Sequence, residues 1–265
     1  MSGTIDRDGT GLAFATAGSG SPVLFQHGLG ADRAQVAEVF PTDPPVRRIT
    51  LECRGQGVSE LGPPEALSIA SFSGDLAALA AHLGIAYAVV GGISMGAAIA
   101  LRLAVRRPDL VRGLILARPA WLFAPGPENI QPYALVGELL GQHDAETARA
   151  EFLKSPIAER LAREAPDNLA SLNGFFDYPE PKTLGALLRA IAVDGPGVSA
   201  DEARVIKVPT LVIGHGEDLA HPWAYAETLA ATIPGAKLVR ITSKVVDRTR
   251  YVAEFKAAVA AFLAA

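Results

Sequence analysis

The chain has little of what marks several protein classes. Cys53 is the only cysteine among 265 residues, so no internal disulfide can form and the thiol is expected to fill space as a small apolar group. Nowhere do eighteen apolar residues run together, and the first residues lack a basic start followed by an apolar segment. These absences favour a cytoplasmic protein that makes no contact with a membrane.

Charge of one sign is also scarce. The formal net charge is −4, and the lysines and arginines are scattered along the chain. A nucleic acid or an anionic membrane would require a clustered basic surface. We therefore expect a small-molecule partner and no nucleic acid, and also no cofactor and no metal ion. The sequence leaves open whether the protein is a monomer or a homodimer.

Apolar residues are plentiful, at 49% of the chain, which is enough to fill the core of a large α/β domain. Apolar runs typical of strands alternate with patterns typical of helices, which predicts a mostly parallel sheet that binds ligands at the carboxyl ends of its strands. We expect strands within residues 4–16, 23–26, 48–53, 86–92, 111–117, 208–214 and 237–242.

The alternation stops between about residues 122 and 205. Helical patterns follow one another there without a strand, at about 130–140, 145–154, 156–163 and 183–193. We therefore expect a core built from residues 1–121 and 206–265, interrupted by a helical cap at 122–205.

Ser94 lies in Gly92-Ile93-Ser94-Met95-Gly96, between an apolar strand and a helix rich in small residues. A hydroxyl that projects from such a sharp turn sits on strained backbone, and the two glycines remove side chains that would clash. The helix also directs its free N–H groups and positive dipole end toward the site. The Met95 N–H and the Leu29 N–H, at the end of an earlier strand, are the expected pair of oxyanion donors.

Four motifs follow one another along the chain: His27-Gly28-Leu29-Gly30, Arg54-Gly55-Gln56-Gly57-Val58-Ser59, the Ser94 turn, and Gly214-His215-Gly216-Glu217-Asp218. In this order they resemble the α/β-hydrolase superfamily, in its lid-bearing branch of esterases, lactonases and C–C bond hydrolases. The resemblance covers nearly the whole chain and implies a mostly parallel central sheet, flanked by helices, with an inserted helical cap. It also implies that Ser94 is the nucleophile and Asp218 the catalytic acid.

The family also has a histidine after its final strand, and here no histidine follows His221. Serine is a weak nucleophile without an adjacent base. The candidates for a substitute base are Lys244, if burial lowers its pKa, His221 or His215 from the acid loop, and His143 from the cap. Alternatively, the site binds a ligand without turnover or catalyses another reaction, such as an elimination or a ring closure.

Three further residues are candidates for substrate binding. Arg118 follows a core strand and could hold a carboxylate in a bidentate pair, with Trp121 as an aromatic wall, or it could form an ion pair between cap and core. His27 faces either the ligand or the back of its own loop, as a structural histidine.

The favoured interpretation is an enzyme that uses Ser94 to hydrolyse a small, partly apolar ester or lactone, carboxylate-bearing if Arg118 faces it. Its apolar pocket would lie over Ser94 beneath the cap. The alternative is a non-hydrolytic member of the fold, either a small-molecule binding protein or a lyase- or cyclase-type enzyme.

Overall fold

An eight-stranded sheet runs through the computed structural model, which describes residues 2–265. The strand order is β1-β2-β4-β3-β5-β6-β7-β8; β1 pairs with β2 and β2 with β4 antiparallel, and all other neighbours are parallel. The predicted mostly parallel sheet is therefore confirmed. The strands are β1 (Ser2–Arg7), β2 (Thr10–Ala17), β3 (Ser21–Gln26), β4 (Val46–Leu51), β5 (Ala88–Ile93), β6 (Val111–Ala117), β7 (Thr210–Gly214) and β8 (Lys237–Arg240).

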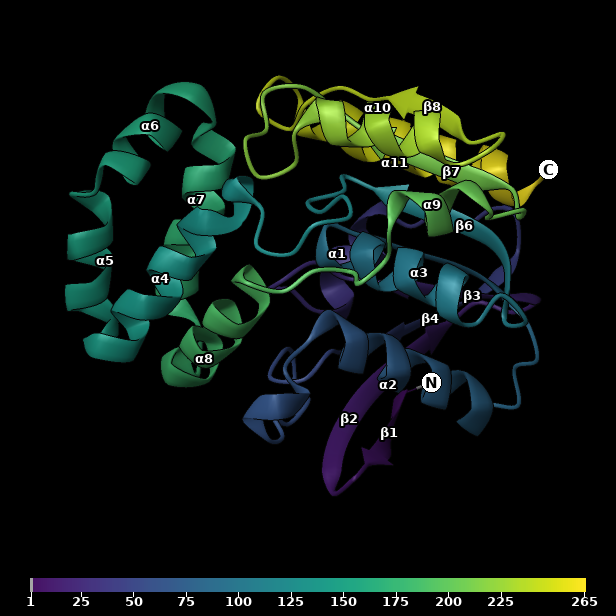
Figure 1. Ribbon diagram of the computed structural model, residues 1–265, viewed down its shortest axis with the longest axis horizontal. Coiled ribbons are helices and arrows are strands. Elements are labelled where there is room, and N and C mark those ends of the chain that lie inside the picture. The colour runs from purple at the N-terminus through teal and green to yellow at the C-terminus, as the bar shows by residue number, and fades with distance from the viewer. Residues whose placement is uncertain (1) are drawn as a thin grey trace.

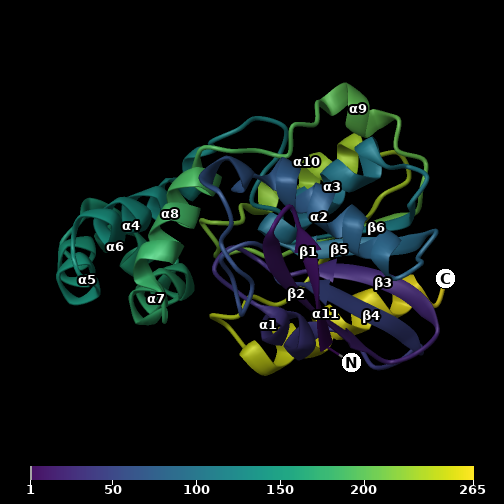
Figure 2. The ribbon, with the colours of Figure 1, turned by 90° about the horizontal axis from the view of Figure 1, so that it is seen from below.

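Helices cover both faces of the sheet because each face carries its own apolar cluster. On one face α1 (Arg33–Val39) and α11 (Arg248–Leu263) pack through residues such as Val36 and Phe255. On the other face lie α2 (Ile69–His82), α3 (Met95–Arg106) and α10 (Trp223–Thr232), as Figure 2 shows. The short elements are η1 (Pro64–Ala66) and α9 (Ala200–Arg204).

The chain between β6 and β7 forms a helical insertion that extends to one side of the sheet (Figure 1). It comprises η2 (Glu128–Ile130), α4 (Gln131–Gln142), α5 (Ala145–Leu153), α6 (Pro156–Glu164), α7 (Pro166–Gly174), η3 (Phe175–Asp177) and α8 (Pro181–Ala192). The sequence did not predict α7. The domain boundaries 1–121, 122–205 and 206–265 stay a prediction. In the described part of the chain, no helix is both long and apolar enough to cross a bilayer.

Register sets the central strand ends level with one another. Ile93 of β5 pairs with Ala117 of β6, which pairs in turn with Ile213 of β7. Ser94 and Arg118 are each the next residue along the chain, so they leave the same edge of the sheet on neighbouring strands, which are about 4.8 Å apart. Topology alone therefore brings the serine turn beside the arginine.

Candidate functional site

Ser94 lies on strained backbone between β5 and α3. Its φ is 57°, a region that side-chain-bearing residues rarely adopt, and such strain clusters at functional sites. A Cβ on Gly92 would lie 2.5 Å from the Gly96 carbonyl carbon, and a Cβ on Gly96 would overlap the Gln26 carbonyl oxygen. Both positions therefore require glycine. Within residues 2–265 neither the Ser94 hydroxyl nor the Met95 N–H forms a hydrogen bond, so both remain available to a ligand.

The loop after β3 presents a second free amide. Gly28 N–H donates to Gln35 Oε1 at 2.8 Å, and Gly30 N–H donates to Gln56 Oε1 at 2.7 Å. Between them, the Leu29 N–H has no acceptor in the described part of the chain. The loop is therefore pinned on both sides of one unused donor, as expected for a preorganised oxyanion site.

His27 is fully buried behind this loop. Its Nε2 accepts the Cys53 N–H at 3.1 Å, so Nδ1 carries the proton and donates to the Gly28 carbonyl at 2.8 Å. Burial lowers the pKa of His27, which keeps the ring neutral. Both ring nitrogens are occupied, so this geometry fits the structural alternative rather than the expected contact with substrate. Burial also raises the pKa of the Cys53 thiol and so holds it in its unreactive form.

Arg118 forms an ion pair with Asp218. Its φ is 45°, in the left-handed region, and its Nε and Nη2 both donate to Asp218 Oδ2, at 3.1 and 2.6 Å. Although burial alone would lower it, the pKa of Arg118 is raised by this carboxylate. The pair joins two loops of the core rather than cap and core, and it leaves the guanidinium little freedom to bind a substrate carboxylate.

Asp218 receives donors from three residues besides the backbone. Asn168 Nδ2 donates to Oδ1 at 2.9 Å, Arg118 donates to Oδ2, and His221 Nδ1 lies 2.9 Å from each carboxylate oxygen. Burial alone would raise the pKa of Asp218, but the facing histidine and arginine hold it well below its usual range. Asp218 is therefore an anion whose orientation is fixed.

His221 has one ring nitrogen engaged and one free. Nδ1 lies 2.9 Å from both oxygens of the ionised Asp218 and 3.1 Å from Arg118 Nη2. We assign the proton to Nδ1 because its two shorter contacts are with the anion, and this assignment leaves a lone pair on Nε2. Nε2 is buried without a hydrogen-bond partner in residues 2–265. Burial lowers the pKa of His221 to about 4. The Asp218 carboxylate acts to raise this pKa, but the nearby Arg118 offsets part of that effect. The ring is a neutral acceptor at physiological pH.

Two other candidate bases border the same cluster. His215 Nδ1 donates to the Gly216 carbonyl at 2.7 Å, and its Nε2 lies 3.6 Å from Asp218 Oδ2. The Lys244 ammonium sits 5.0 Å from the centre of the Tyr251 ring, and burial together with Arg118 lowers its pKa to about 8. Neither residue, nor His221, hydrogen-bonds to the Ser94 hydroxyl.

His143 and Trp121 lie away from this cluster. His143 precedes α5, which is at the outer end of the cap and far from α3 in both ribbon views (Figure 1 and Figure 2). Trp121 is 2% exposed, and its Nε1 donates to the Asp194 carbonyl at 2.9 Å. Trp121 is therefore buried where the core joins the cap, and it does not form the predicted aromatic wall of the pocket.

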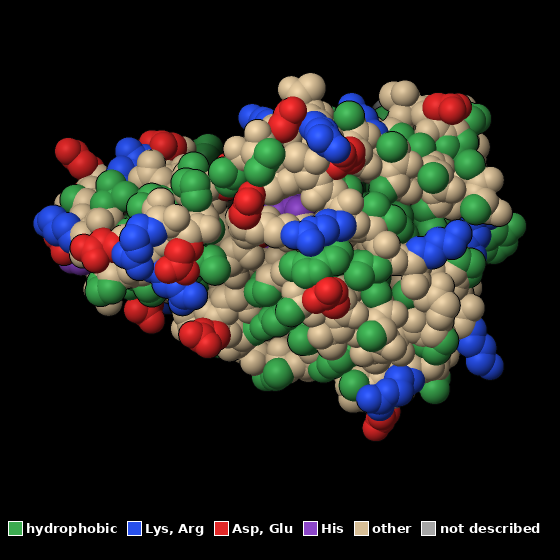
Figure 3. Space-filling view, turned by 90° about the horizontal axis from the view of Figure 1, so that it is seen from above, with side chains coloured by type: hydrophobic (Ala, Val, Ile, Leu, Met, Phe, Trp, Pro, Cys, Tyr) green, Lys and Arg blue, Asp and Glu red, His purple; other side chains and the backbone are tan. Residues whose placement is uncertain are grey.

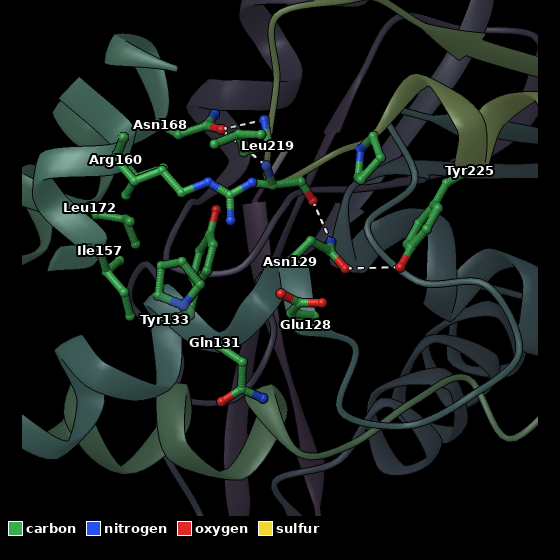
Figure 4. Close-up of a pocket in the computed structure, with 14 residues that line it drawn as sticks. Glu128, Asn129, Gln131, Tyr133, Ile157, Arg160, Asn168, Leu172, Leu219 and Tyr225 are labelled. Atoms are coloured by element: carbon green, nitrogen blue, oxygen red, sulfur yellow. Dashed lines mark hydrogen bonds between the residues drawn. The ribbon is translucent and has the colours of Figure 1, made fainter. Parts of the chain in front are cut away.

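A cavity of about 480 Å³ lies between the cap and the acid loop (Figure 4). Ser94 is not among its lining residues, so its position differs from the pocket expected directly over the serine. Arg160 and Tyr133 project into it, and burial raises the pKa of Tyr133 to about 12, so its hydroxyl stays a donor. The apolar walls include Ile157, Leu161, Leu172, Leu219 and Pro222.

Asn168 belongs to the site but carries no signal in the sequence. It lies in the first turn of α7, next to the helix-start residues Pro166 and Asp167, yet nothing local indicates contact with a loop fifty positions later. On the face shown in Figure 3, acidic and basic side chains are interspersed on the cap, at the left, and are more widely spaced over the core. Among the described residues, no group of three or more His, Cys, Asp or Glu side chains could hold a metal ion.

Known proteins share this architecture. A provisionally named carbamate hydrolase RutD from Pseudomonas savastanoi is 32% identical over 190 residues, which cover 70% of each chain. The enol-lactonase from Burkholderia xenovorans LB400 superposes with a TM-score of 0.75 at 28% identity, over 99% of this chain and 100% of that one. A thermophilic esterase from Thermogutta terrifontis gives 0.70 at 27% identity, over 98% and 94%. Residues 21–243 match the model of the alpha/beta hydrolase fold, and the chain therefore belongs to the α/β-hydrolase fold family.

Proposed function

We propose that the protein is a serine hydrolase of a small ester or lactone, with Ser94 as nucleophile and the Leu29 and Met95 N–H groups as oxyanion donors. His221, oriented by Asp218, is the base that replaces the missing C-terminal histidine. The observation that carries this proposal is the buried Asp218–His221 pair, whose Nε2 faces no other partner in residues 2–265. This is the acid–base half of a triad, supplied by one loop.

In the proposed reaction, Ser94 Oγ attacks the substrate carbonyl carbon while His221 Nε2 takes the hydroxyl proton. The two free amides stabilise the oxyanion, and the leaving oxygen then recovers the proton from His221. Water hydrolyses the resulting acyl-serine by the same route. Because the resting Ser94 hydroxyl has no hydrogen bond in the described chain, substrate binding must bring Oγ and Nε2 to within about 3 Å.

The lactonase and esterase among the similar structures support an ester or lactone as substrate. The cavity supports a partly apolar small molecule, since aliphatic side chains form much of its wall. A carboxylate on the substrate would meet Arg160, which projects into the cavity and pairs with Glu164 through Nε alone, at 3.0 Å. Arg118, in contrast, directs both Nε and Nη2 at the buried Asp218.

One observation favours the non-hydrolytic alternative, a small-molecule binding protein or a lyase- or cyclase-type enzyme. Arg118 neutralises Asp218, and the pKa of about 4 makes His221 a weaker base than an ordinary histidine. If this weakening is decisive, Ser94 is not an efficient nucleophile and the site serves binding.

Labelling with a fluorophosphonate tests the choice. We expect a covalent adduct on Ser94, detected by mass spectrometry of the intact protein, that forms more slowly than in an enzyme with a full triad. Ser94→Ala should show no adduct. Absence of an adduct on the wild-type protein after long exposure would reject the serine hydrolase and leave the binding alternative.

A further inference from the structure

Asn168 links the cap to the acid loop through both ends of its side-chain amide. Nδ2 donates to Asp218 Oδ1 at 2.9 Å, and Oδ1 accepts the N–H groups of Leu219 at 2.9 Å and Ala220 at 3.0 Å. The residue is only 6% exposed, so water cannot easily replace these bonds. One cap side chain therefore holds both the acid and the backbone that follows it.

This contact is specific to Asn168. Among residues 2–265, Asn168 is the only residue of the helical insertion that hydrogen-bonds to Asp218. Arg118, from the core, occupies Oδ2, while Oδ1 accepts from the Asn168 amide and from the His221 backbone N–H at 3.1 Å. A neutral donor satisfies Oδ1 without adding charge beside a carboxylate that already has its cation.

We propose that Asn168 is a positioning residue for the Asp218–His221 pair, so that both carboxylate oxygens are held from outside the acid loop only while the cap is docked on it. The role rests on the proposed function, because it matters for catalysis only if His221 is the base. Lifting α7 away would break all three bonds together and leave the carboxylate held by Arg118 at Oδ2 and by His221, whose backbone N–H donates to Oδ1 at 3.1 Å.

Asn168→Asp separates the two halves of this role. The new side chain keeps oxygen acceptors for the Leu219 and Ala220 amides but replaces the donor with an oxygen beside Asp218 Oδ1. Two carboxylates at this distance share a proton, so the pair titrates at a higher pH than Asp218 alone. We expect fluorophosphonate labelling of Ser94 to begin falling at least about one pH unit higher than in the wild-type protein, with an unchanged circular dichroism spectrum.

Asn129→Ala is the matched control. Asn129 Nδ2 donates to the Ala220 and Ala120 carbonyls, at 2.7 and 3.0 Å, so it anchors the same loop without touching Asp218. Removal of the Asn129 amide should leave the pH dependence of Ser94 labelling unchanged. An equal shift in Asn129→Ala, or none in Asn168→Asp, would show that Asn168 is merely structural.

A second readout does not depend on labelling. NMR titration of the His221 ring should show its pKa raised in Asn168→Asp, because the shared proton leaves extra negative charge beside the imidazolium. Asn168→Ala adds no charge, so the pKa of His221 should be lower in Asn168→Ala than in Asn168→Asp. If Ser94 is never labelled but His221 shifts as expected, the proposed function fails while the positioning contact stands. An unshifted His221 in a folded Asn168→Asp protein overturns the contact itself.

Discussion

Around Asp218, single side chains decide the chemistry because each group has few partners. Arg118 takes one carboxylate oxygen, Asn168 takes the other, and the His221 ring faces both. The result is a neutral imidazole with a free Nε2. At this scale the open question is which group accepts the Ser94 proton, and pH separates the candidates.

The rate of Ser94 labelling against pH should identify the base. A base works in its unprotonated form, so His221, with a pKa of about 4, gives a rate that is flat from about pH 6 upward. Lys244, with a pKa of about 8, would instead give about a tenfold rise per pH unit up to pH 8. We expect the flat profile, and we expect His221→Asn to lower the rate by about 10²- to 10⁴-fold.

Lys244→Met tests the burial of this ammonium. Because its pKa falls from 10.5 to about 8 on folding, the unfolded chain binds more protons between those values, and stability rises with pH there. Below pH 8 Lys244 is charged in both the folded and the unfolded chain, so folding carries the full free-energy cost of burying that charge. We expect Lys244→Met to raise the free energy of unfolding in urea at pH 7 by about 1–2 kcal/mol, after allowing for partial exposure. The gain should shrink toward pH 10.5, and Lys207→Met, at an exposed position, should not stabilise the protein at pH 7.

At the scale of elements, close packing of α3 against the sheet presents Ser94. A side chain on Gly96 would collide with the Gln26 carbonyl of β3, and main-chain atoms cannot move aside cheaply. The helix therefore approaches the strand only because its first turn carries glycine.

Gly96→Ala should accordingly lower the free energy of unfolding by about 1–3 kcal/mol and slow labelling of Ser94 as well. The comparison is Gly74→Ala in α2, where an added Cβ would meet nothing within 4 Å. That change should stabilise the protein by about 0.4–1 kcal/mol, since alanine is the better helix former. Equal destabilisation by both substitutions in urea titrations would contradict the packing argument.

For the molecule as a whole, the buried cluster ties stability to pH. The pKa of His221 is 6.5 in its ordinary form and about 4 here, so the unfolded chain binds more protons as the pH falls through this interval. The contribution of His221 to the free energy of unfolding is fully present above pH 6.5 and is lost as the pH falls toward 4. The lowered pKa of Asp218 acts in the same direction, but only below its ordinary value of 3.8.

His221→Asn should flatten this dependence. Asparagine can still donate to Asp218 but does not titrate. The free energy of unfolding of the wild type should fall by up to about 3 kcal/mol from pH 6.5 to pH 4, and the variant should not show this fall. Urea unfolding of both proteins across this range provides the measurement. Parallel curves for wild type and variant would show that other groups cause the acid sensitivity.

Several expectations for the whole molecule stay predictions: a cytoplasmic location, a monomeric or homodimeric state, and the lack of a nucleic acid, membrane, cofactor or metal partner. Composition and charge favour them, but they concern surroundings that the fold does not contain. The family is established, because residues 21–243 match its model.

Local chemistry determined what the sequence could predict. Alternating apolar patterns fix a parallel sheet, and the glycines around Ser94 fix a strained turn, because both depend on neighbours along the chain. The roles of His27 and Arg118 depended on partners far along the chain, since Cys53 and Asp218 meet them only after folding. The same holds for Asn168, whose function arises from contact between cap and core. Burial then set the pKa of His221, because desolvation exists only in the packed molecule.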